Sequence, residues 1–322
     1  MCGEIAMSFV GRFQTVLRTI PAYVDFRRWQ KEGFLHTFRR HRLWRQILTS
    51  NPVRTSLRSS RSVEVHILCY RLDYLSAIWA LKSFYWTSGV DFPLVIHVNG
   101  AFEKQMFTCL RTHFPDATLV SQEDADRIVG KRLTASGFAR LALARKASPF
   151  MIKLTDFPLM AEGATVLGID SDVLFFDRPS ELIEMAVCPI GGYLFQRDLK
   201  STYNTTPDAA MAFFGIQLAP CVNTGLMVYS SNVPNMEAFE RYLKDPSIAI
   251  PNGFIEQTLY ALHASEIKHI KYLPNTYCID HRANLSWDGI VARHYAGPTR
   301  HLLTEEGMPR IIATGLLNKI VK

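Results

Sequence analysis

The sequence predicts an α/β fold built on a parallel sheet. After residue 62, short apolar runs alternate with stretches of helical periodicity, which is the pattern of βαβ units. One apolar run, residues 166–176, has the composition of a strand buried on both faces. Asp170 and Asp172 stand inside that run, so its polar residues need a separate explanation.

The alternation defines the expected elements in chain order. Before the two aspartates we expect strands at 63–68, 93–98 and 117–120, helices at 73–86 and 102–113, and a helical region over 137–160. After them we expect a strand at 222–229 and helices at 179–185, 235–243 and 253–263. Connections between parallel strands are right-handed, which limits the topologies that this order allows.

The bulk composition is that of a globular protein with a real core. The 322 residues are 48% hydrophobic and 20% charged, enough for one large domain or two small ones. No apolar stretch reaches the roughly 18 residues of a spanning helix, and the first residues lack the order of a secretory signal. The six cysteines are scattered without a CxxC pair, which argues against a zinc site or a disulfide framework. We therefore expect a cytoplasmic protein.

The positive charge lies in residues 1–62, which hold twelve Lys and Arg against three acidic residues. Residues 22–48 mix aromatic and basic residues at roughly helical spacing, which predicts a basic amphipathic helix. Two alternatives stay open: peripheral contact of residues 12–48 with an anionic membrane at its inner face, or a helical extension packed on the body with a solvated basic face. No nucleic-acid motif accompanies the charge, so we expect no specific nucleic-acid partner.

Residues 49–62, with Pro52 and several Ser and Arg, predict a linker. The expected organisation is therefore a basic helical extension and linker over 1–62 and one α/β domain over 63–322.

Asp170 and Asp172 predict a metal site. Two ionised carboxylates at the end of a buried strand are costly unless something compensates them. A divalent cation is the obvious compensation, because hard cations take carboxylate oxygens. Open α/β sheets bind their ligands at the carboxyl ends of the strands, where this pair is expected to lie.

Two motifs in this order resemble a known family. Asp170-Ser171-Asp172 is similar to a DxD motif, and residues 294–300, His-Tyr-Ala-Gly-Pro-Thr-Arg, are similar to the C-terminal metal motif of GT-A glycosyltransferases, most closely family 8, the glycogenin and lipopolysaccharide galactosyltransferase group. The resemblance implies a GT-A, Rossmann-like fold with a mixed, mostly parallel sheet flanked by helices. It also implies Mn²⁺ or Mg²⁺ held by Asp170, Asp172 and His294.

Further segments extend the resemblance over residues 63–300. Arg300 stands where the family has a lysine, and Glu256-Gln257 stands where it has Asp-Gln. The resemblance implies donor contacts from Tyr70, Arg140, Lys153, Asn223, Gly225, Gly297 and Arg300, and catalytic roles for Gln257, Lys153 and Asp170. For Arg140 a solvated helix face stays an open alternative, and for Tyr70 a place in the core does.

The resemblance implies a metal-dependent, retaining glycosyltransferase that moves a hexose from a nucleotide-diphosphate sugar, with a UDP-hexose favoured, to a hydroxyl of a glycan, glycolipid or protein. One alternative is a haloacid-dehalogenase-like Mg²⁺ phosphatase, whose first motif is also a strand ending in Asp-x-Asp. Against it, more than a hundred residues precede the motif, and no later Gly-Asp-x-x-x-Asp occurs. A non-catalytic module that binds nucleotide-sugars or glycans is the other alternative.

Overall fold

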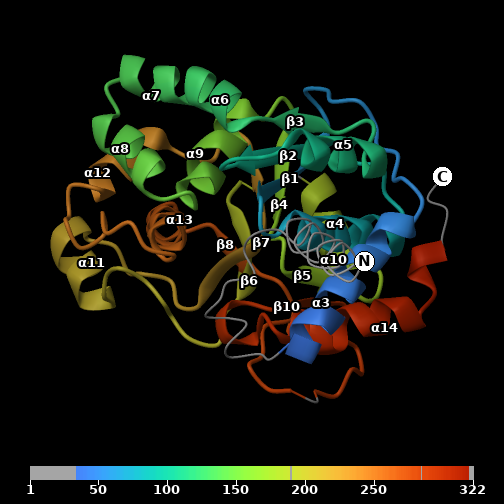
Figure 1. Ribbon diagram of the computed structural model, residues 1–322. Helices are drawn as coiled ribbons and strands as arrows, with labels where there is room; N and C mark the ends of the chain where they lie inside the picture. Colours follow the sequence, from blue (N-terminus) through green and yellow to red (C-terminus); the bar gives the residue numbers. More distant parts are fainter. Residues whose placement is uncertain (1–33, 189–190, 284, 319–322) are drawn as a thin grey trace, which may run out of the picture.

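The structure is a computed structural model that describes residues 34–188, 191–283 and 285–318. Its centre is a seven-stranded sheet in the order β3-β2-β1-β4-β7-β6-β8 (Figure 1). The strands are β1 (Val63–Tyr70), β2 (Leu94–Asn99), β3 (Thr118–Val120), β4 (Thr165–Ile169), β6 (Tyr193–Arg197), β7 (Val222–Ser230) and β8 (Ile270–Tyr272).

The sheet is mixed and mostly parallel. Strands β3, β2, β1 and β4 pair in parallel, whereas β7 runs antiparallel to both β4 and β6. Strand β8 pairs with β6 in parallel. The α/β fold with a mostly parallel sheet flanked by helices, which the sequence predicted, is therefore confirmed.

Helices cover both faces of the sheet (Figure 1). They are α3 (Phe34–Gln46), α4 (Tyr74–Ser88), α5 (Lys104–His113), α6 (Gln122–Ala125), α7 (Lys131–Ala135), α8 (Ala139–Ala147), α9 (Met151–Met160), α10 (Ser180–Val187), α11 (Pro207–Phe214), α12 (Met236–Tyr242), α13 (Ile255–Glu266) and α14 (Met308–Ala313). Successive strand residues face opposite sides, so Leu167 joins the core with α4 while Val166 joins the core with α9 and α13.

A small second sheet carries His294, the third of the predicted metal ligands. Strands β5 (Val173–Phe175), β10 (Ala292–His294) and β9 (Tyr277–Cys278) pair in the order β5-β10-β9. Strand β5 begins directly after Asp172. Strand β10 lies antiparallel to β5 with His294 opposite Val173. This register brings the C-terminal histidine beside the aspartates.

The sequence pattern missed several elements. Strand β6 was not expected, and neither were α11, strands β8 to β10, or the helical turns within residues 122–135. The helical region predicted over 137–160 is two helices, α8 and α9, separated at Ser148. Pro149 explains the break, because a residue before proline avoids helical backbone angles, and Ser148 is extended with ψ of 118°.

The N-terminal helix packs on the body. In α3, Thr37 and Arg40 are buried, while Arg39, Arg42 and Arg45 are exposed. For the described residues 34–48 this matches the alternative of a packed extension with a solvated basic face. Residues 12–33 lie outside the described part of the chain.

Residues 49–62, for which we predicted a linker, also lie against the body. Val53 is fully buried in the core, and the Nζ atom of Lys82 donates to Ser50 Oγ and to the Asn51 carbonyl, both at 2.6 Å. The division of the chain at residue 62 stays a prediction. In the described ranges, every helix is too short or too polar to cross a bilayer.

Candidate metal centre

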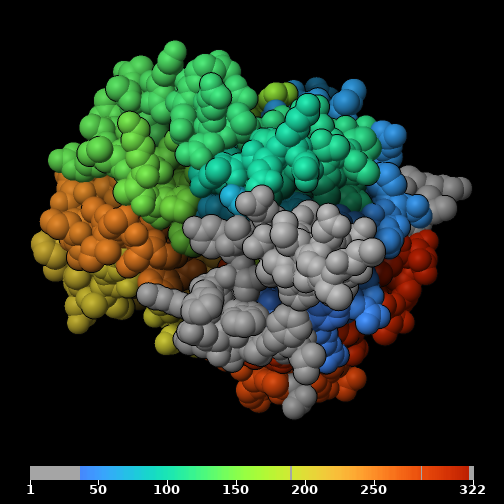
Figure 2. Space-filling view, viewed as in Figure 1, coloured from blue at the N-terminus to red at the C-terminus, as the bar shows by residue number. Residues whose placement is uncertain are grey.

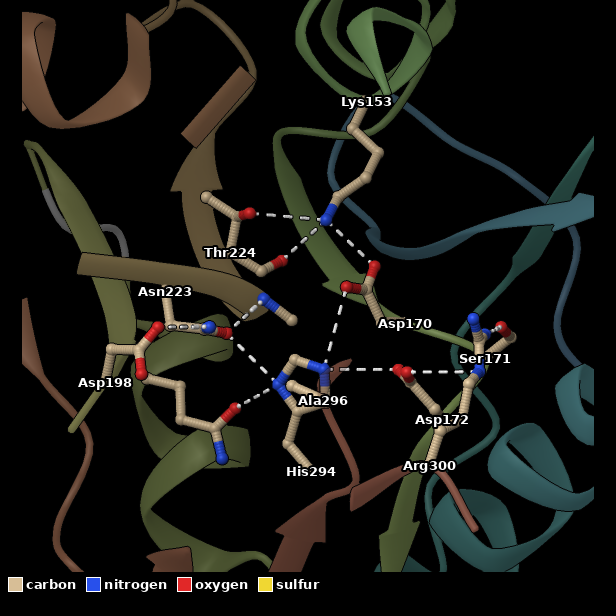
Figure 3. Close-up of polar contacts among 12 residues, drawn as sticks. Lys153, Asp170, Ser171, Asp172, Asp198, Asn223, Thr224, His294, Ala296 and Arg300 are labelled. Carbon is tan, nitrogen blue, oxygen red and sulfur yellow. Dashed lines mark hydrogen bonds and ion pairs between the residues drawn. The ribbon is translucent and has the colours of Figure 1, made fainter. Parts of the chain in front are cut away.

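Asp170, Asp172 and His294 converge at the carboxyl end of β4 (Figure 3). The Nε2 atom of His294 lies 3.1 Å from Asp172 Oδ1 and 4.0 Å from Asp170 Oδ2. One ligand atom from each of the three residues lies within 4.8 Å of the others. Backbone pairing fixes this arrangement, because Asp170 N donates to the Gly225 carbonyl and Tyr295 N donates to the Asp172 carbonyl.

Two amides orient the imidazole of His294. Gln196 donates its amide N–H to the carbonyl oxygens of Tyr277 and Cys278, so its own Oε1 faces His294 Nδ1 at 3.2 Å. Asn223 donates to Asp198 Oδ2, so its Oδ1 faces the same Nδ1 at 3.1 Å. Because amide oxygens only accept, Nδ1 must carry a proton. The ring therefore directs Nε2 at the two carboxylates, as a metal-ligating histidine does.

The residues fit a hard divalent cation. Asp172 and His294 are buried, whereas the Asp170 side chain is 29% exposed, which leaves one open side. Burial opposes ionisation of Asp172, but His294 and Arg300 outweigh it and lower its pKa to about 2. Burial likewise opposes the charged form of His294, but Asp172 outweighs it and raises the His294 pKa. A cation bound here would replace the Nε2 proton, and two carboxylates with one imidazole suit Mn²⁺ or Mg²⁺.

Lys153 closes one side of the centre. It comes from α9, and its Nζ atom lies 2.8 Å from Asp170 Oδ1 and 3.0 Å from the Thr224 carbonyl oxygen (Figure 3). Burial disfavours its charge, but Asp170 and Glu256 outweigh that cost and raise the Lys153 pKa. The side chain therefore stays protonated beside the carboxylates. The structure brings this predicted residue to the site.

Arg300 lies beside Asp172, on the side away from His294 (Figure 3). Its Nε atom lies 3.6 Å from Asp172 Oδ2, and one terminal nitrogen lies 3.6 Å from Asp73 Oδ2. Asp73 also accepts from Ser171 Oγ at 2.8 Å, so the segment after β1 is tied to the Asp-Ser-Asp turn. With 41% of its side chain exposed, Arg300 is available to a ligand. Gly297 opens the turn before it with φ of +55°, which a glycine adopts without strain.

Glu256 and Gln257 are adjacent in the sequence, but their side chains have different partners. Glu256 is buried, accepts from Thr224 Oγ1 at 2.9 Å and lies 3.6 Å from Lys153 Nζ. Burial, opposed by Lys153, raises its pKa to about 7. Gln257 instead donates to the Thr202 carbonyl at 3.0 Å. Of the two, Glu256 is joined to the metal centre through Lys153.

Three predicted donor contacts have other partners in the structure. The exposed Arg140 pairs with Glu240 of α12 at 3.3 Å, and Glu240 also accepts the N–H groups that begin α8. This pairing is consistent with the alternative of a solvated helix face for Arg140, and its donor contact stays a prediction. Asn223 engages His294, Asp198 and Gly225 N rather than open space. At Gly225, a Cβ atom would lie 2.3 Å from His294 Nδ1, so the glycine makes room for the imidazole.

Sequence reasoning missed Gln196, Asp198, Thr224 and Asp73. The one signal was Gln196, a polar residue ending the apolar run 193–195. A buried glutamine requires partners. The register shift between Phe195 and Gln196 pairs Gln196 with Asn223, which is why both amides reach the same histidine.

No protein-family model matches the sequence, and neither does any curated protein. Among solved structures, mouse xyloside xylosyltransferase 1 is similar with a TM-score of 0.47 and 12% identity, over 67% of this chain and 86% of that chain. Galactosyltransferase LgtC, in complex with donor and acceptor sugar analogs, gives 0.49 and 13%, over 79% and 95%. Core-mannan synthase A from Aspergillus fumigatus, in a Mn/GDP form, gives 0.44 and 9%, over 69% and 75%.

At these identities and scores, none of the three assigns an activity to this chain. The likeness is to solved glycosyltransferases and concerns the structure alone.

Proposed function

We propose that this protein is a metal-dependent glycosyltransferase that uses a nucleotide-diphosphate sugar. The observation that carries the proposal is the convergence of Asp170, Asp172 and His294 between two cations, Lys153 and Arg300. A buried acid-rich site flanked by positive side chains suits a cation bridged to an anionic ligand such as a diphosphate. The resemblance of the two motifs to GT-A enzymes supports the same reaction class.

In this proposal each side chain of the site has a distinct role. Asp170, Asp172 and His294 would hold Mn²⁺ or Mg²⁺, which supplies charge neutralisation for a departing nucleoside diphosphate. Arg300, with a planar fork and partial exposure, binds phosphate oxygens from one side. Lys153 holds Asp170 in place and stabilises negative charge near it. Gln196 and Asn223 keep Nε2 of His294 facing the centre.

The finer assignments rest on the sequence resemblance. They are a UDP-hexose as donor, Mn²⁺ as the preferred ion, Gln257 beside the sugar, retention of anomeric configuration, and a glycan, glycolipid or protein as acceptor. Gly297 keeps its proposed donor contact, since it lies three residues before Arg300 and a Cβ there would meet open space. For Asn223 we replace the sugar contact by the orienting role.

Mass spectrometry of a panel of UDP-, GDP-, CDP- and ADP-sugars, incubated with the full chain and Mn²⁺, tests the proposal. We expect slow release of one nucleoside diphosphate, abolished by EDTA and by His294→Ala. Hydrolysis of p-nitrophenyl phosphate without cleavage of any nucleotide-sugar would favour the phosphatase. Tight binding without turnover, even with added saccharide acceptors, would favour the non-catalytic module.

A further inference from the structure

A cavity of about 250 Å³ adjoins the metal centre on the side of Arg300. Its lining includes Tyr70 at the end of β1 and Asp73 after it, Arg300 and His301 after β10, and Arg40 and Trp44 of the N-terminal helix. Arg300 and Asp73 are the residues that join this cavity to the Asp-Ser-Asp turn. A group extending from the metal centre past Arg300 therefore enters a space that α3 partly walls.

Helix α3 is held in this position from two sides. It packs against α4 and against the segment 303–313 that follows Arg300. Figure 2 shows the blue residues of the described N-terminal part directly against the red C-terminal segment. The indole N–H of Trp79 in α4 donates to the Trp44 carbonyl at 3.3 Å. The helix thus bridges the two chain segments that flank the cavity.

The wall from α3 has the chemistry of a nucleoside site. The Trp44 ring lies 5.2 Å below the guanidinium carbon of Arg40, and Tyr70 contributes a second aromatic ring to the lining. Within the described residues, the buried Trp44 Nε1 and Tyr70 Oη have no hydrogen-bond partner. Nucleobases stack on aromatic faces, and unpaired buried N–H and O–H groups indicate a missing polar partner.

We propose that α3 is part of the donor site and that Trp44 contacts the nucleoside of a nucleotide ligand whose phosphates face Arg300. This inference rests on the proposed function. It gives the N-terminal extension a role inside the site, because Arg40 and Trp44 line the cavity, whereas Phe38 on the same helix is 62% exposed.

Calorimetry with the full chain in Mn²⁺ tests the inference. The titrants are UDP, GDP, CDP, ADP and pyrophosphate, the last of which lacks the nucleoside. The variants are Trp44→Leu, Trp44→Phe, which keeps an aromatic ring, and the matched control Phe38→Ala. Thermal melts and Mn²⁺ binding report whether each variant is folded.

We expect Trp44→Leu to weaken the best nucleoside diphosphate by about tenfold and to leave pyrophosphate within about twofold of the wild type. Trp44→Phe should recover most of the loss, and Phe38→Ala should bind as the wild type does. Equal affinity of Trp44→Leu and wild type for that nucleotide overturns the inference, and so does an equal loss for nucleotide and pyrophosphate. If Trp44→Leu does not fold, Arg40→Met takes its place with the same expectations. If the wild type binds none of the nucleotides, the proposed function itself fails.

Discussion

The Nζ atom of Lys153 lies 2.8 Å from Asp170 Oδ1 and 3.6 Å from Glu256 Oε1, so one buried lysine joins two acids. Lys153 and Glu256 come from α9 and α13, which pack against each other on one face of the sheet. The charge of Lys153 compensates an acid that belongs to the core and an acid that belongs to the candidate metal centre. Replacement of Lys153 should therefore lower both the stability of the fold and the turnover, and the two effects can be measured separately.

Lys153→Met should lower the free energy of unfolding by about 3 kcal/mol, because Glu256 is left buried without its charge partner. The double variant Lys153→Met/Glu256→Gln should regain much of that stability in urea titrations, since the residue at position 256 then carries no charge that needs a partner. Nucleotide-sugar turnover should stay low in both variants, because each lacks the positive charge of Lys153 beside Asp170. Recovery of turnover along with stability would mean that Lys153 acts through folding alone.

Gly225→Ala should displace His294, since the new Cβ would lie 2.2 Å from the imidazole Cε1. We expect Mn²⁺ affinity to fall about tenfold to a hundredfold, as it does when the group orienting a ligand is lost. Gly130→Ala is the matched control, because a Cβ there meets open space. Both variants can be compared by titration with Mn²⁺ and circular dichroism. Undiminished Mn²⁺ binding by a folded Gly225→Ala protein would contradict the position of His294.

Lys82→Met should loosen the N-terminal segment. The Nζ atom of the fully buried Lys82 donates to Ser50 and Asn51, and its loss leaves these acceptors unpaired at a cost of about 1–3 kcal/mol. Limited proteolysis should cut within residues 47–62 faster than in the wild type, whereas Lys104→Met, at an exposed lysine, should leave the cleavage rate unchanged. A variant with an unaltered cleavage pattern would show that Lys82 does not hold this segment.

Glu64 should make stability depend on pH in the acid range. Although burial opposes its ionisation, hydrogen bonds from His66 and Arg58 lower its pKa from 4.5 to about 2. An acid with a lowered pKa stabilises the fold fully above pH 4.5, and that stabilisation is lost as the pH falls toward 2. The loss should reach about 3 kcal/mol.

Urea midpoints at pH 7, 4.5 and 2.5 measure this dependence, and the comparison with Glu64→Gln isolates it from other acids. The wild type should lose stability more steeply than the variant over this range. Parallel curves for the two proteins would rule out the assigned role of the buried Glu64 carboxylate, whose Oε1 lies 2.8 Å from Arg58 Nε.

The elements that sequence could predict are those with strong local periodicity. Strand β7 was expected at 222–229 and spans Val222–Ser230, and the helix expected at 73–86 is α4, Tyr74–Ser88. Asp170 could be identified from the sequence because its charge interrupts an apolar run that is typical of a buried strand. Strand β10 has only three residues, which is too short for a recognisable sequence pattern. Its position opposite β5 depends on strand pairing that the local sequence does not indicate.

Partners of polar side chains were harder to predict. We predicted donor contacts for Asn223 and Arg140, and in the structure Asn223 lies beside His294 and Arg140 pairs with Glu240. The reason is that a protein satisfies buried or helix-terminal polar groups internally wherever geometry permits. Which acceptor lies within reach is decided by the packing of α8 on α12 and by the register shift in β6, both of them tertiary features.

Electron paramagnetic resonance of Mn²⁺, titrated with the full chain in the presence of UDP, tests the central claim most directly, because bound Mn²⁺ loses the sharp signal of the free aqueous ion. The wild type should bind a single Mn²⁺ per chain, and Asp172→Asn and His294→Ala should each lose that site while keeping the wild-type melting profile. Equal Mn²⁺ binding by the wild type and both folded variants would contradict a metal centre at Asp170, Asp172 and His294.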